Sequence, residues 1–317
     1  MLYSVPMAMH TIIGLTVLSV FFNIQAPPVP AGDPILRPTY ADIPYGDHPR
    51  QVFDLWIAPG RLGEPAPVCI FIHGGGFAAG DKSQINLDVT EALLDAGISC
   101  VSINYRLTEG GLNPYPAAML DAARVIQTLR YRADQWSLDP DRIACYGGSA
   151  GAGISLWLAF HDDLADPTSF DPVARESTRI LGAATHNGQT TYDHRTYIDW
   201  FDTALIVHPE TTSIFGIGLK EDMLSSRVVK LMVDASPITH LSQDDPPVYL
   251  LYGQPDTPVD EFTDPEVWIH HARLGQRLDH VMRGIGLEST LVYPGSTGED
   301  PYGTLPVFLF SVLTQQP

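Results

Sequence analysis

Short apolar runs alternate with longer amphipathic segments along most of the chain. Several of the runs are apolar on both faces, as strands in the centre of a parallel sheet must be. Seven runs have the length and the β-branched or aromatic content typical of strands: residues 51–59, 68–74, 98–107, 142–148, 179–186, 247–253 and 289–295. The segments with helical periodicity are 87–97, 116–136, 150–164, 265–284 and 305–313.

This alternation predicts an α/β fold with a mostly parallel sheet of about eight strands and helices on both of its faces. The region from about Asp162 to Leu241 is too long for one crossover connection. We therefore expect one domain, residues 27–317, with a cap-like insertion around residues 162–241. Ligands in such folds bind at the carboxyl ends of the strands, and candidate chemistry should be sought there.

The N-terminal residues carry an apolar run that is short for a transmembrane span, followed by a stretch rich in proline and glycine. This pattern favours a secretory signal over residues 1–26, with cleavage near Ala26 and export to the periplasm or the medium. No stable membrane span is then expected in the mature protein. Because no Lys or Arg precedes the apolar run, an uncleaved anchor and a misassigned start remain alternatives.

Composition and charge narrow the functional classes. The 317 residues include 18 basic and 37 acidic side chains, for a formal net charge of -19. Such a charge opposes binding to nucleic acid or to an anionic membrane, and favours a neutral or cationic small molecule as the partner. A simpler interpretation is that the acidic surface keeps the protein soluble. The sequence does not indicate an oligomeric state.

The cysteines do not indicate a disulfide framework or a metal site. Cys69, Cys100 and Cys145 each lie inside an apolar run, where a cysteine usually behaves as a small buried hydrophobe. We expect three free thiols in the core. No metal-binding constellation or nucleotide loop is visible in the sequence, and no cofactor is expected.

A G-x-S-x-G motif stands between the apolar run at 142–148 and the helical segment that begins at residue 150. It consists of Gly147, Ser149 and Gly151. The glycines are needed because the serine sits in a strained turn with little room between strand and helix. That geometry presents the hydroxyl at a helix N-terminus, where the helix dipole favours developing negative charge.

A glycine run directly follows the strand predicted at 68–74. His73, Gly74, Gly75, Gly76 and Phe77 form the sequence HGGGF. Such a run exposes backbone N–H groups without obstruction by side chains, as the stabilisation of an oxyanion requires. A phosphate cradle is the competing interpretation, but neither a Walker lysine nor a GxGxxG spacing before a helix accompanies the run.

With these two motifs, the chain resembles the α/β-hydrolase superfamily and, within it, the hormone-sensitive-lipase-like carboxylesterases. The segments HGGGF, INYRLTEGGLNPYPAAMLDAARVI and SLDPDRIACYGGSAGAG follow the pattern of that group in order, and the resemblance covers roughly residues 45–295. It implies the α/β-hydrolase fold, a small-molecule ester as substrate, and hydrolysis of small or short-chain esters through an acyl-enzyme.

The resemblance also implies roles for individual residues. Ser149 would be the nucleophile, and the N–H groups of Gly75, Gly76 and Ala150 would hold the oxyanion. His73 would be structural.

The acid of the catalytic triad should follow the next-to-last strand. Asp256 lies three residues after Gly253 and three before Val259, which matches the G-x-x-D-x-x-V turn of the family. A solvated loop aspartate is the alternative, because Asp260 and Glu261 follow closely. We predict that Asp256 orients the catalytic base.

The base is missing from its usual place. In the family it follows the last strand, commonly as P-G-x-x-H, but here the same frame reads Pro294, Gly295, Ser296, Thr297 and Gly298. No histidine follows residue 280 of the sequence. A serine hydroxyl without a base is a poor nucleophile, and the proton must be taken by another group if the protein is an enzyme of this type.

Three explanations compete for the missing base. In the first, His270 or His271 has taken over, and His271 is favoured because on a continuous helix it shares a face with Trp268, Gly275 and Leu278. In the second, the base comes from the cap or its flanking strand, with His186, His194, His208 and His240 as candidates. In the third, the protein is a degenerate α/β-hydrolase that binds ligands without turnover. We predict a triad of Ser149, Asp256 and His271.

Overall fold

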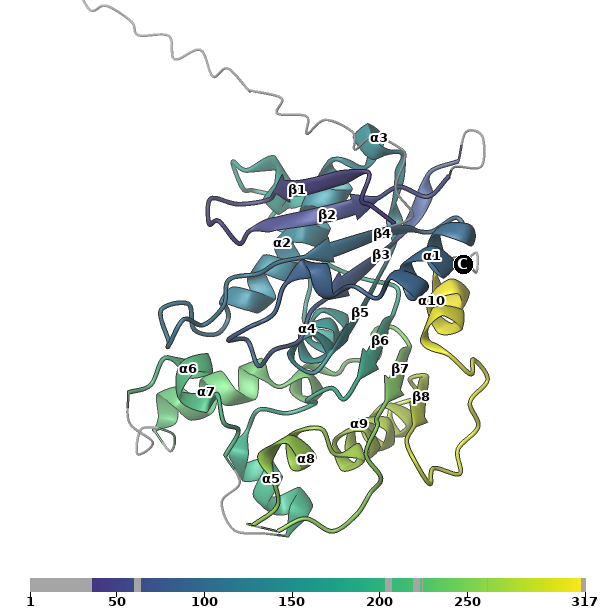
Figure 1. Ribbon diagram of the computed structural model, residues 1–317. Helices are drawn as coiled ribbons and strands as arrows, with labels where there is room; N and C mark the ends of the chain where they lie inside the picture. Colours follow the sequence, from purple (N-terminus) through teal and green to yellow (C-terminus); the bar gives the residue numbers. More distant parts are fainter. Residues whose placement is uncertain are drawn as a thin grey trace, which may run out of the picture.

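The computed structural model describes residues 36–59, 64–202, 207–218, 223, 225–260 and 262–314. These residues contain one eight-stranded sheet with the order β1-β2-β4-β3-β5-β6-β7-β8 (Figure 1). β1 pairs antiparallel with β2 and β2 antiparallel with β4, whereas the pairs from β4 to β8 are parallel. The strands are β1 (Tyr40–Pro44), β2 (Val52–Trp56), β3 (Ala66–Ile72), β4 (Ser99–Ile103), β5 (Leu138–Gly148), β6 (Ala183–His186), β7 (Val248–Leu251) and β8 (Ser289–Val292).

All seven predicted strands are present, and β1 is the strand that the apolar pattern did not predict. Its sequence, YADIP, has one buried residue, Ile43, and ends in a proline. Asp42 within it has a φ of 54°, and the register with β2 shifts between Tyr40 and Ile43. A short, irregular edge strand of this kind leaves no apolar run in the sequence.

Each of the five predicted helical segments contains a helix, and two of those segments are divided, whereas the sequence pattern did not predict α5, α6 and α7. The segment predicted at 116–136 contains α2 and α3, and the segment predicted at 265–284 contains α8 and α9. The α-helices are α1 (Leu87–Asp95), α2 (Ala117–Tyr131), α3 (Ala133–Trp136), α4 (Ala150–Phe160), α5 (His194–Phe201), α6 (Thr211–Phe215), α7 (Ser226–Ala235), α8 (Pro265–Ile269), α9 (Ala272–Gly284) and α10 (Leu305–Thr314); the 3-10 helices are η1 (Lys82–Gln84), η2 (Pro172–Arg175) and η4 (Pro237–His240).

Helices cover both faces of the sheet (Figure 1). One face packs against α1 and α10, and the other against α2, α4 and α9. Side chains of β3 alternate between the two cores, with Val68 and Ile70 in one and Cys69 in the other. Both faces of the central strands are therefore buried, which explains their continuous apolar runs. The fold class predicted from the sequence is confirmed.

The predicted insertion at 162–241 is interrupted by β6, which is an internal strand of the sheet. A connection containing η2 precedes β6. The longer segment between β6 and β7 carries α5, α6, α7 and η4. Figure 1 shows α5 near α8 beyond one end of the sheet, and α6 and α7 close to each other to the left of them.

Two further predictions concern the N-terminal segment and the cysteines. The predicted signal at residues 1–26 lies outside the described residues. Cys69, Cys100 and Cys145 are buried free thiols, as predicted. Within the described ranges, no helix has both the length and the apolar character that crossing a membrane would require.

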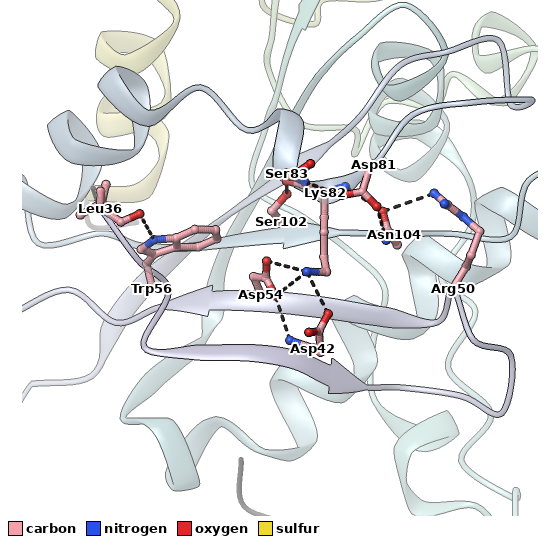
Figure 2. Close-up of polar contacts among 10 residues, drawn as sticks. All are labelled: Leu36, Asp42, Arg50, Asp54, Trp56, Asp81, Lys82, Ser83, Ser102 and Asn104. Atoms are coloured by element: carbon pink, nitrogen blue, oxygen red, sulfur yellow. Dashed lines mark hydrogen bonds and ion pairs between the residues drawn. The ribbon is translucent and has the colours of Figure 1, made fainter. Parts of the chain in front are cut away.

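A polar network joins the loop after β3 to β1, to β2 and to the residue that follows β4 (Figure 2). Lys82 Nζ lies 2.7 Å from Asp54 Oδ2 and 3.0 Å from Asp42 Oδ1. The Lys82 backbone N–H donates to Asn104 Oδ1 at 2.7 Å. Burial lowers the pKa of Lys82, but the two carboxylates outweigh it and the pKa is raised. The lysine is thus held charged, and it anchors the segment that follows the glycine run.

Candidate active site

Ser149 occupies the turn between β5 and α4. Its backbone has φ 53° and ψ −121°, a strained conformation for a residue with a side chain, and its N–H donates to His186 O at 2.9 Å. A Cβ on Gly151 would lie 2.0 Å from the carbonyl oxygen of Ile72 in β3. The backbone of β3 therefore passes directly against the turn, and this close approach requires glycine at residue 151.

The glycine run forms a tight loop beside this turn. Gly75 and Gly76 have φ values of 106° and 59°, and a Cβ on Gly75 would lie 2.4 Å from Ala79 O. Among the residues that the structure describes, the backbone N–H groups of Gly75, Gly76 and Ala150 have no hydrogen-bond acceptor. These are the three groups predicted to hold an oxyanion, and each remains available to a ligand.

His73 directly precedes the glycine run in the sequence, and its side chain is completely buried. Its Nδ1–H donates to Gly74 O at 2.7 Å, its Nε2 accepts from Arg50 Nη2 at 3.2 Å, and its ring stacks on Tyr105. Burial lowers the pKa of His73 to about 4, with a further contribution from Arg50. His73 is therefore a neutral histidine that holds the loop in place.

A cleft of about 320 Å³ opens at the carboxyl ends of β3, β5 and β6. This is the end of the sheet at which the sequence predicted the site. The residues that line the cleft are Phe71, Gly74, Gly75, Gln84, Gly148, Ser149, His186, Asn187 and His270.

The imidazole beside Ser149 is that of His270, at the end of α8. His270 Nε2 lies 2.9 Å from Ser149 Oγ. His270 Nδ1 lies 3.0 Å from the carbonyl oxygen of Glu266 and 3.3 Å from its Oε2. Because a carbonyl oxygen only accepts, the Nδ1 atom carries the proton and Nε2 keeps a lone pair for the serine hydroxyl. This is the tautomer that a general base requires.

Burial lowers the pKa of His270 more than the neighbouring Glu266 carboxylate raises it. The imidazole is consequently neutral near pH 7. Glu266 itself is largely exposed, with 72% of its side chain accessible.

His271, the favoured base in the predicted triad, does not lie beside Ser149. The prediction assumed one continuous helix, but α8 ends at Ile269 and α9 begins at Ala272. His271 is the extended N-cap between them, with φ −73° and ψ 139°. Its Nδ1 accepts the Arg273 N–H at 3.1 Å, and its Nε2–H donates to Thr257 O at 2.8 Å. Both ring nitrogens are occupied, and the side chain is buried.

Asp256 is likewise engaged elsewhere. Its Oδ1 lies 2.8 Å from Arg273 Nη2 and 3.9 Å from His271 Nδ1. The structure thus brings Asp256 and His271 together, but not with Ser149.

The carboxylate near His270 belongs to Glu266, which was not predicted from the sequence. Its four-residue spacing from His270 inside a helical pattern was the available signal, because such residues lie on one face of a helix.

The other candidate histidines are also placed apart from the serine hydroxyl. His186 lines the cleft, and burial together with the nearby His270 lowers its pKa. His194 Nε2 lies 3.0 Å from Thr211 Oγ1, and His208 Nδ1 accepts the Glu210 N–H. His240 contacts the carbonyl oxygen of residue 234. Among the described histidines, His270 is the one that is hydrogen-bonded to the serine.

The family position for the base is on the far side of β8. Gly298 lies in the exposed loop after that strand, and the nearest atom to a Cβ placed there would be Leu291 O at 3.9 Å. It does not line the cleft.

Comparison with protein families and known sequences agrees with this architecture. The BD-FAE family model matches residues 53–263. The protein named "Probable carboxylic ester hydrolase LipM", from Mycobacterium tuberculosis, is 31% identical over 221 residues, covering 69% of this chain and 48% of the relative. Esterase LipQ of the same organism is 31% identical over 227 residues, covering 69% and 49%. The chain therefore spans about half the length of the curated relatives it matches.

Solved structures share the fold at lower identity. A truncated carbohydrate esterase from gut microbiota superposes with a TM-score of 0.66 at 17% identity, covering 87% of this chain and 96% of that one. An acetyl ester-xyloside bifunctional hydrolase from Caldicellulosiruptor lactoaceticus gives a TM-score of 0.58 at 21% identity, covering 81% and 86%.

Proposed function

Because the chain belongs to the BD-FAE family of hormone-sensitive-lipase-like α/β-hydrolases, we propose that it is a carboxylic ester hydrolase with Ser149 as its nucleophile. The observation that carries this proposal is the 2.9 Å contact between Ser149 Oγ and His270 Nε2, in a cleft beside backbone N–H groups that have no acceptor among the described residues. The curated relatives that are named as ester hydrolases support it.

In the first half of the reaction, His270 takes the proton of Ser149 as the oxygen attacks the ester carbonyl. The Nδ1–H of His270 stays hydrogen-bonded to the Glu266 carbonyl, and the Glu266 carboxylate at 3.3 Å stabilises the imidazolium that forms. The imidazolium then gives its proton to the departing alcohol. A water activated by His270 hydrolyses the acyl-enzyme by the same steps in reverse order.

The charge that develops on the carbonyl oxygen is met by the N–H groups of Gly75, Gly76 and Ala150. These groups need no reorganisation, since they have no acceptor among the described residues. One such donor typically contributes about 10²–10³-fold to kcat. Ala150 is the first residue of α4, and its N–H therefore adds the favourable end of the helix dipole.

The substrate class follows from size and charge. The cleft of about 320 Å³ lies at the small end of the usual range of ligand sites, roughly 300–1,000 Å³, and favours small or short-chain acyl groups. A net charge of -19 disfavours anionic esters. The mechanism uses side chains, backbone groups and water.

Hydrolysis of p-nitrophenyl acetate tests the proposal. We expect a burst of p-nitrophenol in the wild type and its loss in Ser149→Ala, together with labelling of Ser149 by a serine-reactive organophosphate. Wild-type activity no greater than that of Ser149→Ala would exclude the enzyme. If ligands then still raised the melting temperature, the protein would be a binding protein on a hydrolase fold.

A further inference from the structure

Two histidines and an aspartate gather at the end of α4 that is farther from Ser149. His161 directly follows this helix, Asp234 belongs to α7, and His240 ends η4. One possible ligand atom from each residue lies within 4.8 Å of the others. The imidazoles are half-buried and the carboxylate is exposed. The group plays no part in the ester chemistry described above.

Hydrogen bonds hold one nitrogen of each imidazole. His161 Nδ1–H donates to Asp162 O at 2.9 Å, and His240 Nε2–H donates to Asp234 O at 2.6 Å. These bonds fix the tautomers, so that Nε2 of His161 and Nδ1 of His240 keep their lone pairs. Metal-bound histidines in proteins almost always have their second nitrogen held in this manner.

Neighbouring aromatic residues orient the three side chains. The centroid of the Trp157 ring lies 4.0 Å from that of the His161 ring. It lies 6.1 Å from that of the His240 ring, which it meets edge-on. Tyr115 O–H donates to Asp234 Oδ2 at 2.7 Å, which leaves the second carboxylate oxygen available. Part of the ordering that a metal site requires is therefore already present in the folded protein.

We propose that His161, Asp234 and His240 bind a divalent first-row transition metal ion such as Zn²⁺. Two imidazoles and one carboxylate suit such ions, whereas Ca²⁺ and Mg²⁺ prefer oxygen ligands alone. Ligand atoms on a tetrahedral zinc ion are about 3.4 Å apart, given bonds of about 2.0–2.1 Å. The three ligand atoms now lie within 4.8 Å of one another, so they would move closer together when the ion binds.

The position of the site indicates its role. His161 lies about twelve residues after Ser149 along α4, which corresponds to roughly 18 Å of helix. His161 directly follows α4, whereas Asp234 belongs to α7 and His240 to η4. An ion bound by all three would therefore link α7 and η4 to the end of α4. The ion would raise the stability of the fold without entering the ester reaction.

Isothermal titration of the full chain with ZnCl₂, after dialysis against EDTA, tests the site. We expect one zinc ion to bind per chain, and a rise in melting temperature that CaCl₂ does not produce. His161→Ala and His240→Ala should each weaken zinc binding at least about tenfold. His280→Ala, which removes an exposed histidine of α9, is the matched control and should bind as the wild type does.

Asp234→Asn tests the site with a variant that keeps the size of the side chain. Its amide oxygen can still accept from Tyr115, but the anionic ligand is lost, and weaker zinc binding with an unchanged apo melting temperature is expected. Equal affinity and stoichiometry in all three ligand variants would overturn the proposal. Ser149→Ala should retain zinc binding, and failure of this site is thereby distinguished from failure of the ester hydrolase.

Discussion

His270 Nε2 lies 2.9 Å from Ser149 Oγ, although 121 residues separate the two in the chain. The histidine reaches the serine from the short helix α8, between β7 and β8, and not from the loop after β8. Both segments follow the carboxyl ends of parallel strands, but His270 lines the cleft and Gly298 does not. The role of the base can therefore pass to another element while the serine turn and the oxyanion loop stay unchanged.

The first prediction concerns the base. His270→Ala should lower kcat for p-nitrophenyl acetate at least about a hundredfold, because it removes the group that takes the Ser149 proton. Steady-state kinetics at pH 7.5, with folding checked by circular dichroism, measure this loss.

His271→Ala is the matched control for that experiment. It removes the N-cap of α9 and a buried ring, so it should lower the free energy of unfolding by about 1 kcal/mol or more while kcat stays within a few-fold of wild type. A large loss of kcat in His271→Ala, with kcat of His270→Ala unchanged, would mean that His271 is the base, as the sequence pattern favoured.

The second prediction separates the two carboxylates. Glu266→Gln keeps the backbone carbonyl that holds His270 Nδ1–H but removes the charge 3.3 Å away, and kcat should fall. Asp256→Asn should leave kcat nearly unchanged, because Asp256 pairs with Arg273 and not with His270. The ratio of kcat between these two variants is the measurement. A greater loss in Asp256→Asn would mean that Asp256 orients the base.

The third prediction is a pH profile. The pKa of His270 is lowered by burial, and its neutral form is the base. Activity is therefore present above this pKa and is lost as pH falls through it, with a midpoint in kcat/KM below the usual histidine value of about 6.5. The Glu266 carboxylate raises this pKa, and Glu266→Gln should move the midpoint to still lower pH. A midpoint above 6.5 in the wild type would contradict this assignment.

The sequence predicted the sheet and the serine turn because both depend on local requirements. Ser149 needs glycine at residue 151, where the backbone of β3 approaches to a distance that excludes a Cβ. The glycine run after β3 has a similar requirement at Gly75. Such constraints appear directly as residue types in fixed order, and they can be found without knowledge of the tertiary structure.

The base and its partner could not be predicted in the same way. Apolar residues keep one helical period across 265–284, and the period does not reveal the break at residues 270 and 271. That break comes from tertiary contacts: His271 turns inward to reach Thr257 O, and His270 is left at the end of α8 facing Ser149. Contacts of both His271 ring nitrogens, with Thr257 O and with the Arg273 N–H, thus accompany the placement of His270 beside the serine.

The fourth prediction concerns the support of the oxyanion loop. The side chains of Lys82 and Asp54 are only 12% and 11% exposed. Removing one partner therefore leaves the other as a largely buried charge without its ion pair. Lys82→Met should lower the free energy of unfolding by about 3 kcal/mol. It should also lower kcat, because the segment after the glycine run loses its anchor.

A double-mutant cycle measures the coupling between this pair. Lys82→Met combined with Asp54→Asn should cost less than the sum of the two single changes, by about 0.5–3 kcal/mol in urea unfolding. Strict additivity would mean that the two side chains do not stabilise each other.

The fifth prediction concerns acid stability and His208. Burial, followed by the nearby His194 and His270, lowers the pKa of His208 to about 4. Its unfolded value is about 6.5, and the unfolded chain therefore binds the proton more readily between these pH values. Stability contributed by the neutral ring is present above pH 6.5 and is lost as pH falls toward 4, by about 2–3 kcal/mol at pH 4.5. His208→Gln retains an acceptor for the Glu210 N–H but does not titrate. The difference in free energy of unfolding between wild type and this variant should shrink by that amount from pH 7 to 4.5, whereas a constant difference would show that His208 titrates normally in the folded protein.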